Sequence, residues 1–115
     1  MKVYEGRWEG CAAVVTVNGH ALDPRLDLWN HSPTGFEWGY VGSGPAQLAL
    51  ALVAYHLGDD QQALNLSQRF KWAVVTQLPL KRWRLTSEQI AQSLRELGVT
   101  ETVAVAARRG ARVGK

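Results

Sequence analysis

A glycine loop ahead of an apolar stretch is the first place where residue types and spacing suggest chemistry. Gly42, Ser43 and Gly44 stand directly before "PAQLALALVAYHL", and backbone N–H groups at such a helix start can bind an anion. The specific anion-binding motifs need more: the lysine followed by serine or threonine of a P-loop is absent, and so is the G-x-G-x-x-G spacing. We therefore expect residues 42–44 to begin a helix, and keep an anion-binding domain or small enzyme at this loop as an alternative.

Histidine, serine and carboxylate residues form no recognisable catalytic or metal-binding motif. His20, His31 and His56 lack the spacing of a metal-ligand pair. Ser32, next to His31 and close to Asp27, has no nucleophile-elbow sequence around it, and neighbours in sequence seldom converge into a triad. The sequence therefore predicts no metal and no cofactor and assigns no catalytic residue. Whether the protein is an enzyme stays open, with the balance against it.

Tryptophan and basic residues are interleaved at two places. The stretches "RFKW" and "KRWR" supply Arg69, Lys71, Trp72, Arg82, Trp83 and Arg84. Such residues can stack on bases and contact phosphates, and the same types anchor protein interfaces when they are exposed. A third interpretation needs no partner, because Trp72 and Trp83 can pack on arginine stems at the domain edge.

A polar segment before the glycine loop has residues without an obvious structural role. Asn30, His31 and Glu37 lie in "NHSPTGFEW", together with Trp38. Exposed polar and aromatic residues on loops often serve binding, so these four join the candidate binding residues.

The net charge of +3 is unevenly distributed. Residues 1–101 contain nine Lys and Arg against ten Asp and Glu, a net charge of −1, while Arg108, Arg109 and two further basic residues follow. Nucleic-acid backbones are bound by clustered cations. The near-neutral body therefore favours a protein partner over nucleic acid.

The first part of the chain alternates as strands do. "KVYEGRW" and "CAAVVTV" predict a hairpin that turns at Glu9–Gly10, with Cys11 buried as a small apolar thiol. Asn18–Gly19 is the strongest hairpin signal, and "HAL" follows as a short third strand. "FEWGY" and "KRWRL" are expected as further short strands, with Phe36, Trp38 and Tyr40 on one side of the former.

Three helices are predicted from periodicity and capping residues. The segment at about 45–57 is apolar nearly all round, so it should be central, with Gln47 reaching back to its N-terminal cap. The second helix should start after Asp59 and run to Leu78. The third follows a capping box of Thr86 and Gln89.

Three stretches, "NHSPTGFEWGY", "GSGPAQLALAL" and "QRFKWAVV", resemble a small family of functionally uncharacterised domains found in bacteria, phages and mobile elements. The resemblance covers most of residues 2–97 and implies a compact α+β domain that often stands alone; it implies no activity. The loop of that family is typically similar to "GYGGSGP", so Val41 departs from it. Valine suits a positive φ badly, which weakens the anion-binding interpretation.

These observations predict one α+β domain over residues 1–101, a small antiparallel sheet packed on two or three helices, followed by a short strand and a basic, flexible tail over 102–115. We expect a non-enzymatic, protein-binding module of the cytoplasm, an accessory of a phage or mobile element such as an inhibitor of a host defence complex. The first alternative is a nucleic-acid-binding protein that uses both tryptophan motifs with Arg108 and Arg109. A homodimer stays open, and no membrane contact is expected.

Overall fold

Four short strands form one antiparallel sheet. The computed structural model describes residues 1–98. The strands are β1 (Val3–Glu9), β2 (Ala12–Val17), β3 (His20–Ala21) and β4 (Arg82–Thr86), and they pair in the order β3-β2-β1-β4. Every pairing is antiparallel. β1 is therefore an inner strand, and β4 forms one edge of the sheet.

Two tight turns connect the first three strands. Asn18 and Gly19 have φ angles of 50° and 84°, the positive values that a two-residue type I′ turn requires, so this predicted turn is confirmed. The turn between β1 and β2 contains Gly10, with φ of 64°, and Cys11, which is exposed. The prediction of a buried thiol is wrong, because the hairpin turns one residue later than expected and places Cys11 at its tip.

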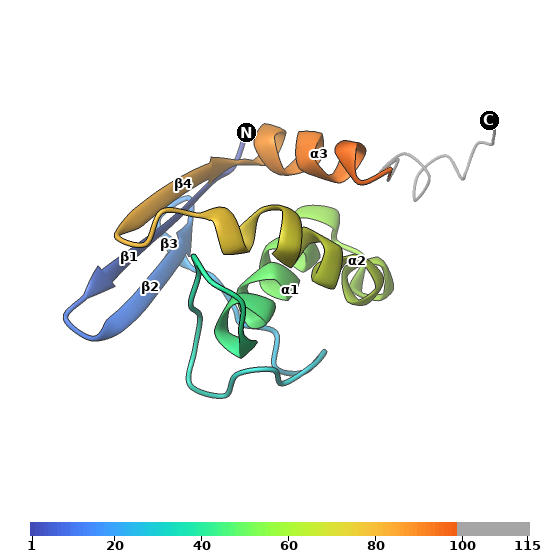
Figure 1. Ribbon diagram of the computed structural model, residues 1–115. Coiled ribbons are helices and arrows are strands. Elements are labelled where there is room, and N and C mark those ends of the chain that lie inside the picture. The colour runs from blue at the N-terminus through green and yellow to red at the C-terminus, as the bar shows by residue number, and fades with distance from the viewer. Residues whose placement is uncertain (99–115) are drawn as a thin grey trace.

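Three helices and a 3-10 turn lie on one side of the sheet, and no helix or strand of residues 1–98 covers its other face (Figure 1). They are α1 (Ser43–Leu57), α2 (Asp60–Ala73), η1 (Val75–Gln77) and α3 (Ser87–Glu96), which follows β4 directly. α1 is central, since every residue from 44 to 54 is buried. The predicted α+β architecture with its apolar central helix is confirmed. No helix within residues 1–98 is long and apolar enough to cross a membrane.

The helix ends follow local rules, with one exception. Gly58 ends α1 with φ of 65°, and the Asp59 side chain accepts a hydrogen bond from the Gln62 N–H. Thr86 and Gln89 form both bonds of the predicted capping box. The prediction that the second helix runs to Leu78 is wrong: α2 ends at Ala73. The β-branched run from 74 to 76 disfavours a helix, and the chain tightens into η1 there.

The expected strand "FEWGY" does not form. Phe36 and Trp38 are buried, but Tyr40 is 45% exposed, so the three rings do not share one side. The segment pairs with no strand of residues 1–98; instead the Gly39 N–H donates to the Val75 carbonyl in η1, at 3.0 Å. The alternating burial of Phe36 and Trp38 therefore comes from an irregular segment that places both rings in the core, not from a strand.

A tryptophan cluster joins the sheet to the loop before β4. The indole N–H groups of Trp8 and Trp38 both donate to the Leu80 carbonyl oxygen, each at 3.0 Å. Trp38 also meets Trp83 edge-on, with ring centroids 5.7 Å apart. A Cβ on Gly6 would come within 2.3 Å of the Trp83 indole nitrogen, so β1 has a glycine where that ring crosses it.

Candidate functional site

A groove lies between the loop of residues 24–32 and α2, with aromatic rings in its wall. It has a volume of about 400 Å³ and mostly apolar walls, formed by Trp29, His31, Gln61, Leu64, Ser67 and Gln68. The Trp29 ring is 59% exposed and stacks on His31, with centroids 5.7 Å apart and 26° between the planes. We call this surface the aromatic groove.

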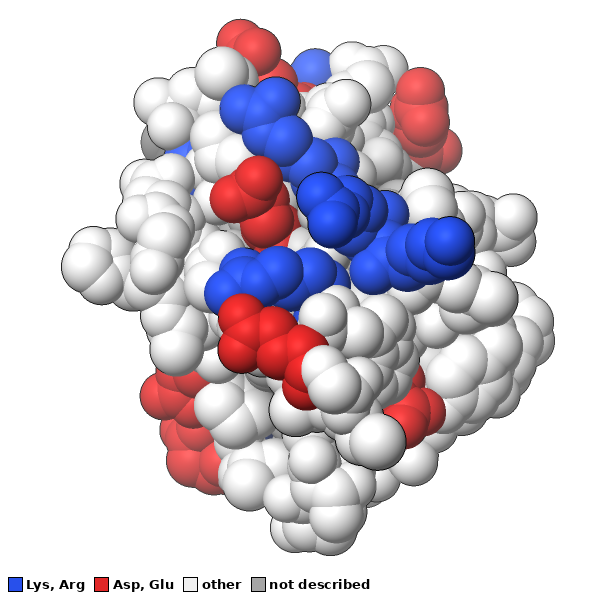
Figure 2. Space-filling view, turned by 90° about the vertical axis from the view of Figure 1, so that its left-hand side faces the viewer, with Lys and Arg blue, Asp and Glu red and all other residues white. Residues whose placement is uncertain are grey.

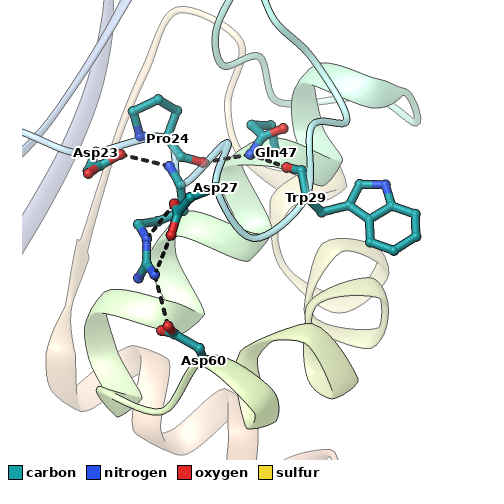
Figure 3. Close-up of polar contacts among 7 residues, drawn as sticks. Asp23, Pro24, Asp27, Trp29, Gln47 and Asp60 are labelled. Atoms are coloured by element: carbon teal, nitrogen blue, oxygen red, sulfur yellow. Dashed lines mark hydrogen bonds and ion pairs between the residues drawn. The ribbon is translucent and has the colours of Figure 1, made fainter.

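Gln47 holds the loop side of the aromatic groove in place. It is fully buried on α1. Its Nε2 donates to the carbonyls of Pro24 (2.6 Å) and Trp29 (3.0 Å), and its Oε1 accepts from the N–H groups of His31 (2.7 Å) and Ser32 (3.1 Å). These four bonds use the full capacity of the amide. Figure 3 shows the Gln47 bonds to Pro24 and Trp29, and the Trp29 ring pointing away from them.

The prediction that Gln47 reaches back to its own helix start is wrong. The N-cap of α1 is Gly42, which makes no side-chain capping bond. The backbone of residues 24–32 is buried in part against α1 and needs hydrogen-bond partners that water cannot reach. Gln47 supplies them, so the first turn of α1 braces the aromatic groove.

Arg25 ties the same loop to the start of α2 (Figure 3). Its guanidinium donates to both carboxylate oxygens of Asp27, at 3.0 and 3.1 Å, and to Asp60 at 3.0 Å. Arg25 has a positive φ of 56°, and its N–H is held by the Asp23 side chain at 2.8 Å. The bond to Arg25 lowers the pKa of Asp27. Exposed ion pairs stabilise little, so the main consequence is positional: Arg25 joins the loop to the start of α2.

His31 is electrostatically suited to an apolar groove. Burial lowers its pKa below the usual 6.5, and the positive charge of Lys71 lowers it further. Both effects disfavour the imidazolium. At neutral pH His31 therefore presents a neutral ring beside Trp29.

Trp72 extends the aromatic surface along α2. Gln61, Leu64, Gln68 and Trp72 follow at spacings of three and four, so they share one helix face. The Trp72 ring is 57% exposed, and the Lys71 Nζ lies 5.2 Å from its centroid. This distance is within the range of a cation–π contact. This face of α2 thus carries a second large aromatic ring, that of Trp72.

The glycine loop is occupied by the protein itself. A Cβ on Gly44 would come within 2.7 Å of the Glu37 Cβ, so Glu37 packs on the first turn of α1. The Glu37 carboxylate also accepts a hydrogen bond from the Tyr40 hydroxyl. A carboxylate at this position would repel an incoming anion, which argues against anion binding at Gly42, Ser43 and Gly44. Asn30 is exposed next to the aromatic groove.

The two tryptophan motifs do not combine into one surface. Trp83 and Trp38 are 5% and 1% exposed and belong to the core. Arg82 and Arg84 lie on the uncovered face of the sheet, whereas Arg69 and Lys71 are on α2, on the other side of the sheet (Figure 1). Arg108, Arg109, the short strand and the flexible tail that were expected over 102–115 lie outside the described residues. Among residues 1–98, no three His, Cys, Asp or Glu side chains gather as metal ligands would.

Residues 4–96 match a family model described as a family of unknown function, DUF6166. The chain belongs to this family. No curated protein and no solved structure matched the chain. Membership in a family of unknown function assigns no activity to the chain, so we infer its function from the geometry of the aromatic groove and the sheet.

The sequence interpretation missed Trp29, Leu64 and Gln47. A usable signal existed for Leu64, because its spacing places it on the same helix face as Gln68 and Trp72, outside the predicted apolar face of Ala63 and Phe70. Trp29 stands in an irregular loop, where no periodicity shows which way a side chain points. Gln47 could not be found, since its partners lie 15 to 23 residues away.

Proposed function

We propose that the protein is a non-enzymatic binding module whose aromatic groove accepts a short apolar segment of a partner protein. The observation that carries the proposal is the exposed Trp29 ring, held on a loop that Gln47 fixes through four hydrogen bonds. Exposed tryptophan is enriched at binding hot spots. A loop whose backbone is already held in place loses little conformational entropy on binding.

The size of the aromatic groove favours an inserted segment over a second copy of the chain. A volume of about 400 Å³ accommodates a few side chains, whereas a stable interface buries roughly 800 Å² on each partner. Its neutral, mostly apolar walls suit apolar or aromatic side chains. The glutamines at its rim, Gln61 and Gln68, can hydrogen-bond the backbone of such a segment.

The narrower role proposed here, an accessory of a phage or mobile element that acts in the cytoplasm on a host defence complex, rests on the family resemblance alone. The aromatic groove would be the surface that engages that complex. The groove proposal is independent of that role.

Site-specific photo-crosslinking tests the proposal. A benzophenone amino acid replaces Gln68 in the aromatic groove, and a second variant carries it at the exposed Gln92 on α3 as a matched control. Crosslinked proteins from cells that express each variant are identified, and the purified partner is then titrated calorimetrically against the wild type, Trp29→Ala and Trp83→Phe.

We expect one partner at position 68 that is absent at 92, with affinity at least tenfold weaker for Trp29→Ala and unchanged for Trp83→Phe. Equal crosslinks at both positions, or a partner that binds Trp29→Ala as tightly as wild type, would overturn the proposal. A crosslink to another copy of the chain alone would show a homodimer and would also overturn it.

A further inference from the structure

The edge of the sheet at β4 presents unused backbone hydrogen-bonding groups. The Ser87 N–H donates to the Lys2 carbonyl at 2.9 Å. In an antiparallel ladder, residues that bond one neighbour alternate with residues directed to the other side. Trp83 and Leu85 therefore bond β1, and the N–H and C=O groups of Arg82 and Arg84 point to the open edge. Among residues 1–98, no hydrogen bond is made to these groups.

The side chains of the same two residues are also unpaired. Within the described chain, neither Arg82 nor Arg84 takes part in an ion pair, whereas Arg7 is paired with Glu9. Arg7 stands directly opposite Arg82 in the register, a like-charge pair that destabilises a sheet. Because the pair of Arg7 and Arg82 does not stabilise the fold, stability gives no reason for an arginine at position 82.

The uncovered face of the sheet is hollowed where these arginines lie. A depression of about 480 Å³ is lined by backbone and side chains of β1 and β4, with Pro79 at its margin. Arg7, Arg82 and Arg84 border it, and so does Glu5, which stands opposite Arg84 in the register. Figure 2 looks onto this face and shows basic side chains gathered in a band, with acidic ones between and beside them. Open backbone groups and two arginines without an ion pair among residues 1–98 thus occur on one strand.

We propose that β4 binds an extended acidic segment of a partner protein as an added strand. This site goes beyond the aromatic groove and does not depend on it. Side chains on one face of a strand repeat every two residues, about 6.6 Å. An added strand has the same repeat, so acidic residues at alternate positions would meet Arg82 and Arg84 while its backbone bonds theirs.

Two other occupants fit the β4 edge less well. A second copy paired through β4 would bring arginine against arginine, which charge repulsion opposes. Single-stranded nucleic acid is usually held by aromatic rings as well as cations, and the exposed side chains of β1 and β4 on this face are charged rather than aromatic. Charged residues on an edge strand can also serve only to prevent aggregation. With that role alone, Arg82 and Arg84 would bind no peptide.

A labelled-peptide titration with backbone readout tests the proposal. The probe is a short fluorescein-labelled peptide that alternates glutamate with valine and threonine. A peptide of the same composition with N-methylated alternate amides controls for strand pairing, and a labelled oligo-dT for nucleic acid. The variants are Arg82→Glu/Arg84→Glu and, as a control of equal charge change, Arg69→Glu/Arg95→Glu. Amide hydrogen exchange is followed by NMR, and circular dichroism checks the fold.

We expect the alternating peptide to bind with salt-dependent affinity, and the β4 double variant to bind at least tenfold more weakly than the control double variant. Binding should slow amide exchange at Arg82 and Arg84, and the N-methylated peptide should not bind. Absence of peptide binding, peptide binding without protection of these amides, or tighter binding of oligo-dT than of the peptide would each overturn the proposal. If the β4 double variant does not fold, Arg84→Thr with the exchange measurement decides in the same way.

Discussion

The aromatic groove and the β4 edge are built in opposite ways. Around the aromatic groove the polar groups are satisfied within the fold, since Gln47 makes four hydrogen bonds and Arg25 joins two carboxylates. Along β4, two guanidinium groups and the backbone beside them have no partner within residues 1–98. The loop of the aromatic groove is therefore held by buried hydrogen bonds of the fold, whereas the outward groups of Arg82 and Arg84 make no such bonds within residues 1–98.

The strongest test of this contrast is Gln47→Leu. The substitution keeps the size of the side chain but leaves two N–H and two C=O groups of residues 24–32 without partners. Since each unsatisfied buried group costs on the order of 1 kcal/mol or more, we expect the free energy of unfolding to fall by about 3 kcal/mol. Urea denaturation measures it. Gln92→Leu, on the exposed face of α3, should change the free energy of unfolding by less than about 0.5 kcal/mol. Equal effects of the two variants would show that the Gln47 hydrogen bonds do not hold the loop in place.

Gly6→Ala comes next and tests the inner face behind the β4 edge. The added methyl group meets the Trp83 indole at 2.3 to 2.7 Å. Overpacking of this kind costs about 1–3 kcal/mol. In a Trp83→Leu background the same substitution should cost much less, and a double-mutant cycle measures this coupling. Additive effects would show that the ring does not impose the glycine.

A smaller change of opposite sign is expected at the β4 edge itself. Arg82→Thr removes the like charge opposite Arg7 and introduces a residue that favours strands, so it should raise stability by roughly 0.5 kcal/mol. The gain should shrink in high salt, where charge repulsion is screened. Thermal unfolding at two salt concentrations measures it. A clear loss of stability would mean that Arg82 has a structural role, and would remove the contrast with the aromatic groove.

The smallest effect concerns pH and His31. Its pKa in the folded protein lies below the usual 6.5, so the unfolded chain takes up a proton at a higher pH than the folded chain. Stability therefore falls as pH drops from about 6.5 towards the folded-state pKa, and is unaffected by this group above that window. Unfolding of wild type and His31→Asn between pH 7.5 and about 5 tests this: the variant should lose part of the pH dependence. Identical profiles would show that His31 does not contribute.

The parts of the fold that could be predicted from the sequence are those with local causes. The turn at Asn18–Gly19 and the caps at Asp59 and Thr86 depend on residues within three positions of one another. "FEWGY" misled because burial on alternate residues also arises when an irregular segment inserts two rings into a core. A strand forms only where the open edge of another strand is close enough to pair with it, and the sequence does not show which strand edge is close to this segment.

The candidate sites were harder to predict from the sequence, because their residues come together from distant parts of the chain. The aromatic groove combines a loop, the first turn of α1 and one face of α2, and Gln47 is an ordinary helical residue until its distant partners are known. For "KRWR" the residues were found but not their separation: β4 turns Trp83 into the core and the two arginines outward. Because side chains alternate between the two faces of a strand, Trp83 of this motif packs in the core while the two arginines face outward, where we propose that they bind.

The Leu80 carbonyl has a consequence for what this family can vary. It accepts two indole N–H groups from positions 72 and 42 residues earlier in the chain, yet the Leu80 side chain is 64% exposed. A backbone oxygen is supplied by every amino acid, so these two bonds do not depend on the side chain at residue 80. An insertion or deletion between η1 and β4 would instead move the oxygen away from both rings. Across relatives we therefore expect this loop to drift in composition but to keep its length.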